Sequence, residues 1–330
     1  MSAATPSTRP FAALRGAGLR RYLQGHPIVV LSLLFLVLVG LLEVIRPGAV
    51  TPNWVRTTIL FAAPLGILAA GQTLVMLTGG IDLSVANVAT AAAYVMASNA
   101  RHGDLQAVML GLAVGVAVGL VNGLGIAVFQ AQPLIMTLGM ALVVTGGLTV
   151  YSQYAVASVP SVPASIHTLG GGTILGFIPV SLLLWAPIAV VIVVGLRRTG
   201  FGRLLYAIGD NAAASRLAGV RVWQVRLVNY TLCGLLSAVA GLVLAGTINT
   251  ADVGLASTFL LPTVAAVVIG GTSIFGGSGN YSGTIIGALI LTVLNSLLTL
   301  LDAPEPIKQI LYGAIILLLA TAYTRVLSDT

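Results

Sequence analysis

Residues 105–128 read LQAVMLGLAVGVAVGLVNGLGIAV and contain no charged side chain. They open a longer uncharged stretch, since no Asp, Glu, Lys or Arg occurs from Leu105 to Leu196. A second such stretch runs from Val253 to Leu301. A helix needs about 20 apolar residues to cross the hydrocarbon core of a bilayer. The first stretch therefore predicts about three membrane spans, and the second predicts about two.

The composition of the whole chain agrees with lipid as its main solvent. Of its 330 residues, 58% are hydrophobic and only 7% are charged, whereas a soluble domain has roughly 25% charged residues. Too few polar groups are present to cover a surface that faces water. The single cysteine, Cys233, excludes an internal disulfide and a thiolate metal site. We predict an all-α membrane protein, folded as a polytopic helical bundle.

Apolar runs separated by Gly, Pro and charged residues place about ten transmembrane helices along the chain. The proline- and glycine-rich segment 155–178 is interpreted as a loop outside the membrane. The predicted spans are 27–45, 56–78, 83–100, 105–128, 134–154, 179–196, 227–246, 258–271, 282–301 and 307–324.

The basic residues predict the orientation of the bundle. Most of the 15 lysine and arginine residues lie before the first span, in the 197–226 loop, or at Arg325. Cytoplasmic loops carry such an excess, so both termini are predicted to be cytoplasmic. The chain then divides into a cytoplasmic tail (1–26), a transmembrane domain (27–325) with a cytoplasmic loop at 197–226, and a second tail (326–330). The basic residues do not form one exposed face with aromatics, so nucleic acid is not an expected partner.

The 105–128 span carries a glycine every four residues, at Gly111, Gly115, Gly119 and Gly123. Such a stripe lets another helix approach closely, which is how helices associate in lipid. Because Asn122 lies nearby, a role in lining a pore is the alternative interpretation.

Several kinds of chemistry lack their residues. Lys308 is the only lysine, and no G-x-x-x-x-G-K-[ST] motif occurs, so the chain has no P-loop for a nucleotide. The three histidines lie far apart without metal-ligand spacing. No nucleophile–base pattern is present. We therefore expect no catalytic residue, no metal site and no cofactor bound by this chain.

The segment GQTLVMLTGGIDLSVANV (71–88) places a charge between two apolar runs. Asp82 or Ser84 can cap the helix that follows, because their oxygens can accept its first N–H groups. Alternatively, broken backbone at membrane depth marks a substrate path or gate. The candidates for such a path or gate are Gln72, Thr78, Asp82, Ser84, Asn122, Thr272, Ser273 and Asn295.

A second glycine-rich segment, AAVVIGGTSIFGGSGNYSGTIIGALI (265–290), ends an apolar run in the same manner. It has the glycine density of a phosphate-binding loop. Without a lysine or a strand context, a broken turn between two spans is the favoured interpretation.

The loop at 197–226 contains the signature of a short helix, with Asn211 as N-cap, Ala212–Ala218 as two turns and Gly219 as the stop. Two turns are too short to be stable alone, so we expect this helix to dock on a partner. The alternative is a solvated loop that only supplies positive charge. The residues assigned to docking are Arg203, Asn211, Ala214, Ser215, Arg216 and Gly219.

Together, GQTLVMLTGGIDLSV, RRTGFGRLLYAIGDNAAASRLAGV and the 265–290 segment resemble the ribose-type sugar permeases of ABC importers. That wider family includes permeases for branched-chain amino acids and nucleosides. The resemblance implies a bacterial inner-membrane subunit that is not itself an enzyme. It also implies a second permease subunit (an identical copy or a paralogue), two ATPase subunits that hold ATP and Mg²⁺, and a periplasmic or extracellular substrate-binding protein. The 197–226 loop matches the segment that contacts the ATPase.

The uncharged stretches favour a small neutral solute. A charge in the bilayer interior costs at least ~2.5–3.5 kcal/mol, and these stretches supply no counter-charge. They do supply side chains such as Asn122, Thr272 and Asn295, which can exchange hydrogen bonds with hydroxyl groups. A monosaccharide is therefore the expected substrate, with a nucleoside or a branched-chain amino acid as alternatives. A self-sufficient secondary transporter is the alternative from another class.

Overall fold

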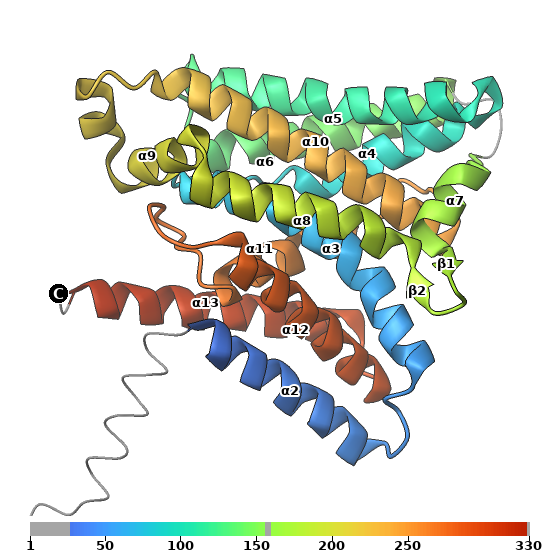
Figure 1. The fold of residues 1–330 in the computed structure, drawn as a ribbon. Helices are drawn as coiled ribbons and strands as arrows, with labels where there is room; N and C mark the ends of the chain where they lie inside the picture. The colour runs from blue at the N-terminus through green and yellow to red at the C-terminus, as the bar shows by residue number, and fades with distance from the viewer. Residues whose placement is uncertain (1–26, 156–159, 329–330) are drawn as a thin grey trace, which may run out of the picture.

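The computed structural model describes residues 27–155 and 160–328 of the chain. The described residues fold almost entirely into helices, with one two-stranded hairpin (Figure 1). In chain order the elements are α2 (Pro27–Ile45), α3 (Pro52–Leu77), α4 (Val85–Ser98), η1 (Ala100–His102), α5 (Asp104–Ala127), α6 (Pro133–Val150), the π-helical η2 (Tyr151–Ala155), α7 (Ala164–Gly171), β1 (Thr173–Ile174), β2 (Ile178–Pro179), α8 (Val180–Arg198), α9 (Gly200–Leu217), α10 (Val222–Ile248), η3 (Ser257–Phe259), α11 (Leu260–Ile269), α12 (Tyr281–Leu300) and α13 (Glu305–Ser328).

Every predicted span corresponds to a helix. Among the described residues, seven helices are long and apolar enough to cross a membrane: α2, α3, α5, α6 with η2, α8, α10 and α12. The apolar helices α4 and α11 are shorter, and α13 is the last of the ten. The prediction of a polytopic helical membrane protein is therefore confirmed. The helices α3 and α10 begin at Pro52 and Val222, four or five residues before their predicted starts.

Two helices form the centre of the bundle. Every residue of α3 from Ala62 to Leu77 is buried, and α10 is buried along most of its length. Such helices are hydrophobic all round because other helices, rather than lipid, surround them. By contrast α2, α6 and α8 expose large apolar side chains, as expected of helices that face lipid or another subunit.

The glycine stripe of α5 packs against α10. A Cβ atom added at Gly115 would lie 2.4 Å from the carbonyl oxygen of Gly234. At Gly119 and Gly123 the nearest atoms would be the carbonyl oxygens of Tyr230 and Leu227, at 2.6 and 2.9 Å. The backbones approach too closely for any side chain, so the packing interpretation is confirmed at these three positions.

Both short helices follow irregular backbone that other elements stabilise. Before α4, the N–H of Leu83 donates to the Thr137 hydroxyl, which in turn donates to the Ile81 carbonyl. Before α11, the N–H of Ala256 donates to the Thr90 hydroxyl at 3.0 Å. Side chains from α6 and α4 thus satisfy backbone groups that lipid could not, as membrane burial requires.

The two ends of the bundle carry different connections. Figure 1 shows α9 and the C-terminal end of α13 at one end, with α7 and the β1–β2 hairpin at the other. The described part of the predicted loop 155–178 is more structured than expected, because it contains α7 and the hairpin. The helix α7 packs on α10, where a Cβ at Gly170 would lie 2.4 Å from the Val243 carbonyl oxygen.

The predicted boundaries at 197–226 and 326–330 also change. Most of 197–226 is helical, because α9 begins at Gly200, two residues after α8 ends. The last helix continues to Ser328, so the predicted tail at 326–330 begins inside α13. The predicted tail at 1–26 lies outside the described residues.

Candidate functional site

A buried polar cluster surrounds Asp82, in the irregular segment between α3 and α4. The Asp82 carboxylate accepts hydrogen bonds from the N–H and the hydroxyl of Ser84, at 2.8 and 2.6 Å. The amide of Asn122 on α5 donates to the same Ser84 hydroxyl at 3.0 Å, and the Cys233 thiol of α10 also contacts Asp82. Asp82 is 2% exposed. Among the described residues the only ion pair is elsewhere, between Lys308 and Glu305.

This geometry changes the capping interpretation. Ser84 occupies the N-cap position of α4, but its side chain makes no capping hydrogen bond. Asp82 binds the N-cap residue itself instead of the first N–H groups of the helix. The carboxylate therefore fixes the turn that precedes α4. The adjacent Gly80 leaves room for the Tyr230 side chain, because a Cβ atom would lie 2.3 Å from the Tyr230 hydroxyl oxygen.

At the α9 end, the predicted short helix is present. Asn211 has non-helical backbone angles (φ −155°, ψ 99°) that divide α9 into two parts. Its side-chain oxygen accepts the N–H groups of Ala213 and Ala214, at 3.0 and 2.9 Å. This confirms the N-cap. Gly219 has φ +85°, as expected of a residue that stops a helix.

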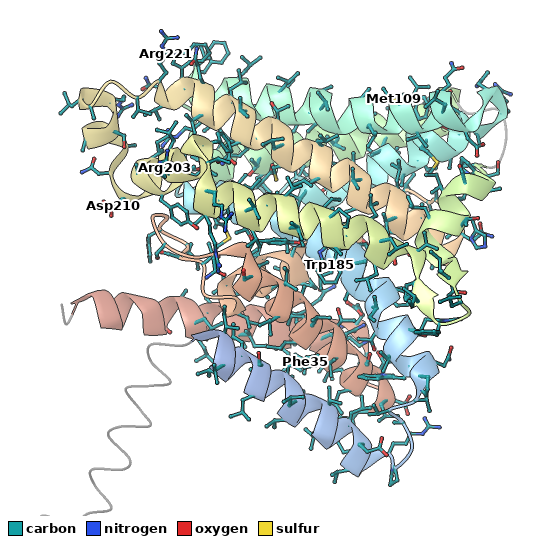
Figure 2. All side chains as sticks on the ribbon, viewed as in Figure 1. Phe35, Met109, Trp185, Arg203, Asp210 and Arg221 are labelled. Atoms are coloured by element: carbon teal, nitrogen blue, oxygen red, sulfur yellow. The ribbon has the colours of Figure 1, made fainter. Side chains whose placement is uncertain are left out.

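The two faces of this short helix differ in exposure. Ser215 is buried, and its hydroxyl donates to the Ala207 carbonyl at 2.9 Å. Ser215 thus holds the short helix against the first part of α9, and its side chain is turned away from the outer face. The outer face carries Ala214 and Leu217, and Leu217 is 91% exposed. Arg203 and Arg216 are also exposed (Figure 2 shows Arg203).

The first part of α9 is seated on two other segments through glycine. A Cβ atom at Gly209 would lie 1.9 Å from the Leu77 carbonyl oxygen and 2.3 Å from the Gly277 nitrogen. Gly277 N–H donates to that same Leu77 oxygen at 3.1 Å, and the Tyr206 hydroxyl donates to the Gly279 carbonyl at 2.8 Å. We call this contact between α9, the end of α3 and the 271–280 loop the glycine junction. Its α3 residue, Leu77, lies five residues before Asp82 along the chain.

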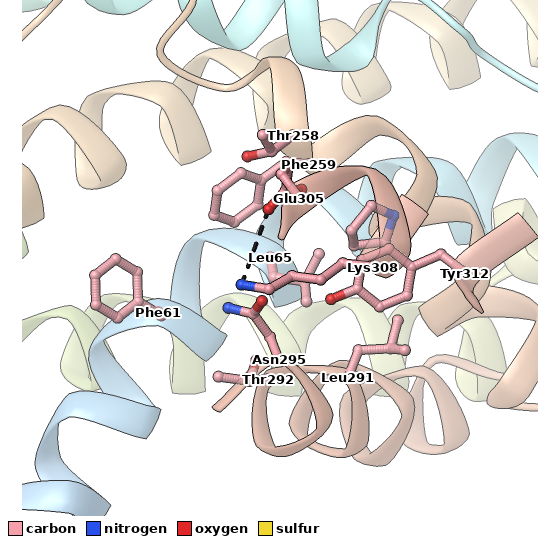
Figure 3. Close-up of a pocket in the computed structure, with 11 residues that line it drawn as sticks. Phe61, Leu65, Thr258, Phe259, Leu291, Thr292, Asn295, Glu305, Lys308 and Tyr312 are labelled. Carbon is pink, nitrogen blue, oxygen red and sulfur yellow. Dashed lines mark ion pairs between the residues drawn. The ribbon is translucent and has the colours of Figure 1, made fainter. Parts of the chain in front are cut away.

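A separate cavity of about 240 Å³ lies between α3, η3, α11, α12 and α13 (Figure 3). Its polar groups come from Thr258, Thr292, Asn295, Glu305, Lys308 and Tyr312. Lys308 donates to Thr299 at 2.8 Å and lies 3.9 Å from Glu305. Phe61, Phe259 and Leu291 supply part of the apolar lining. The mixture of apolar walls with a few polar groups is typical of a small-molecule site.

Comparisons with known proteins assign the chain to a family. The family model described as "Branched-chain amino acid transport system / permease component" matches residues 55–320. This chain belongs to that permease family. The permease is 34% identical to the ribose import permease of Escherichia coli (strain K12), over 86% of this chain and 89% of the relative.

Two further relatives carry other sugar names. The L-arabinose ABC transporter permease of Azospirillum brasilense is 32% identical, over 87% of this chain and 84% of the relative. The fructose import permease of Rhizobium meliloti is 33% identical, over 91% and 86%. No solved structure matches the permease.

The structure separates the residues predicted to form a path. It brings Asp82, Ser84 and Asn122 together, whereas Thr78 receives the Asn229 amide at 3.4 Å. Gln72 is fully buried on α3, and neither atom of its amide has a partner. Thr272 and Ser273 are buried in the loop of the glycine junction.

Only Asn295 of that set lines the cavity. The other polar lining residues were missed because they belong to three separate elements, η3, α12 and α13. Those on α13, such as Glu305 and Lys308, also lie just outside the uncharged stretch. The single available signal was the short spacing of Thr292 and Asn295, which share one face of α12.

Proposed function

We propose that this permease is the membrane-spanning subunit of an ATP-driven importer that carries a monosaccharide. The observation that carries the proposal is the match to ribose, arabinose and fructose permeases over more than four fifths of each relative. The bundle of long apolar helices and a small cavity with hydroxyl, amide and phenol groups support it. ATP and Mg²⁺ would be held by a separate ATPase subunit, and a substrate-binding protein would deliver the sugar.

The short helix that follows Asn211 is the proposed contact for the ATPase. It offers an exposed apolar side chain, Leu217, beside the small Ala214. Behind it, the glycine junction joins α9 directly to the end of α3. A displacement of α9 would therefore act on the segment that leads to Asp82. Asp82 and its partners would serve as a hinge for the path rather than as its lining.

An amino acid is the second candidate substrate, because of a specific feature of the cavity. Glu305 and Lys308 place one charge of each sign at its wall, and a zwitterion carries the complementary pair. The two charges already neutralise each other, however, and Lys308 is further bound to Thr299. Asn295 and Thr258 have no partner among the described side chains, so the groups that remain available are neutral. This favours a polyhydroxylated solute.

Uptake by the full importer, with its ATPase and binding protein, tests the proposal. Vesicles are offered labelled pentoses, hexoses, nucleosides and branched-chain amino acids. We expect ATP-dependent accumulation of one monosaccharide and none of the amino acids. Accumulation of an amino acid alone would overturn the sugar assignment, and uptake without the ATPase would overturn the importer class.

A further inference from the structure

A groove of about 510 Å³ lies between the end of α5 and the start of α10, beside the short helix of α9. Three arginine side chains line it: Arg216, Arg221 and Arg226. The rest of the lining is largely apolar and comprises Ala127, Val128, Val220, Val222 and Trp223, together with Gln130. Figure 2 shows Arg221 at the end of the bundle that also carries Arg203.

The positive charge of this groove is not compensated within the described part of the chain. No acidic residue lines the groove, and none of its three arginines takes part in the one ion pair found there. Arg216 and Arg226 lie close enough to repel each other. The start of α10 adds further positive potential through the helix dipole, and Arg221 provides no side-chain cap there. A bound anion would remove this repulsion.

The depth of the groove indicates what kind of anion fits. Arg226 lies one turn inside α10 and is half-buried, about 5 Å below the start of the helix. The apolar residues beside it are the last of one membrane helix and the first of another. Trp223, at the start of α10, is 47% exposed, and tryptophan is enriched where membrane meets water.

We propose that this groove binds an anionic phospholipid, with its phosphate on Arg221 and Arg226 and its acyl chains along the apolar wall. Arginine is suited to this role because its planar fork binds phosphate oxygens in pairs. Basic pockets between helices at the cytoplasmic surface bind lipid headgroups through the same chemistry. An acidic surface of the ATPase could approach Arg216 and Arg221 from the aqueous side. Such a surface would not reach Arg226, which lies one turn further along α10.

The test uses the full chain in nanodiscs of phosphatidylcholine alone or with phosphatidylglycerol added. Lipid retained after delipidation is measured by native mass spectrometry, and thermal stability is measured in both discs. We expect phosphatidylglycerol to be retained and to stabilise the protein. Arg221→Gln and Arg226→Gln should each weaken retention roughly fivefold, and Arg226→Lys, which keeps the charge, should restore part of it.

The matched control is Arg198→Gln, which removes an arginine at the same end but outside the groove; it should leave retention unchanged. An equal loss of phosphatidylglycerol retention in Arg198→Gln and Arg226→Gln would overturn the site. Unchanged retention in both variants would overturn it as well. Inorganic phosphate that stabilises the protein in phosphatidylcholine as well as the anionic lipid does would assign the groove to free phosphate. Unchanged lipid retention with lost ATPase binding in Arg221→Gln would assign it to the ATPase.

Discussion

At the residue scale, Asp82 is a carboxylate held inside the bundle by neutral partners. Ser84 donates two hydrogen bonds to it, and Asn122 orients the Ser84 hydroxyl from α5. Leaving a buried acceptor without its donors, or buried donors without their acceptor, lowers the stability of the fold. The role of Asp82 in the turn before α4 therefore depends on its oxygen atoms more than on its charge.

Substitutions at Asp82 separate these two properties. Asp82→Asn keeps an oxygen for Ser84, so its thermal stability and uptake should remain near those of the parent. Asp82→Leu leaves the Ser84 N–H and hydroxyl without an acceptor and should cost about 1–3 kcal/mol for each. Thermal unfolding of the purified full chain measures this loss. Asp210→Leu, at an exposed carboxylate, is the control. Normal stability with lost uptake in Asp82→Asn would instead give the charge a role in transport.

At the element scale, the contact between α5 and α10 depends on the absence of side chains. Gly115 faces Gly234 across it, and a Cβ at either residue would lie within 2.4 Å of the other backbone. In lipid, where apolar burial gives helices no preference for one another, this closeness supplies the packing that holds them together.

Gly115→Ala tests this contact. The added methyl group also meets the Ala238 side chain at 2.5 Å, so the helices must separate, at a cost of about 1–3 kcal/mol. The measurement is the thermal midpoint in detergent, together with the yield of monodisperse protein. Gly139→Ala on α6, where nothing lies within 4 Å, should show no loss. Similar midpoints for the two variants would show that α5 can move away from α10 without penalty.

The short helix of α9 is the second element with a testable role. Ala214→Glu places a charge on the exposed face of this helix. The alanine side chain makes no hydrogen bond that the change could break, so the protein should still fold. If the helix docks on the ATPase, co-purification of the ATPase should weaken by about 2 kcal/mol or more, as at a central interface position. Leu175→Glu, exposed at the opposite end, is the matched control. Undiminished co-purification of Ala214→Glu would identify the segment as a charged linker.

At the scale of the whole molecule, segments predicted to share one side of the membrane lie at the same end of the bundle. The segments 197–226 and 271–280 meet in the glycine junction at one end. The hairpin and α7 lie at the other end (Figure 1). Which end faces the cytoplasm stays a prediction.

Cysteine labelling determines the orientation. Phe177→Cys in the hairpin and Leu217→Cys in α9 both replace exposed side chains. We expect an impermeant maleimide to label the first in intact cells and the second only after lysis. The unchanged parent is the control, because Cys233 is fully buried and should not react. Labelling of Leu217→Cys in intact cells would reverse the topology.

The sequence by itself determined the membrane character, the ten helices and the cap at Asn211. These features depend on local composition and on hydrogen bonds between residues two or three apart, which a sequence displays directly. Only the tertiary structure decided that Asp82 binds Ser84 rather than capping α4, and that Ser215 faces inward. It also assembled the cavity and the arginine groove from residues on several helices. Such sites depend on how helices are packed and rotated about their axes, and uniformly apolar helices carry little of that information in their sequences.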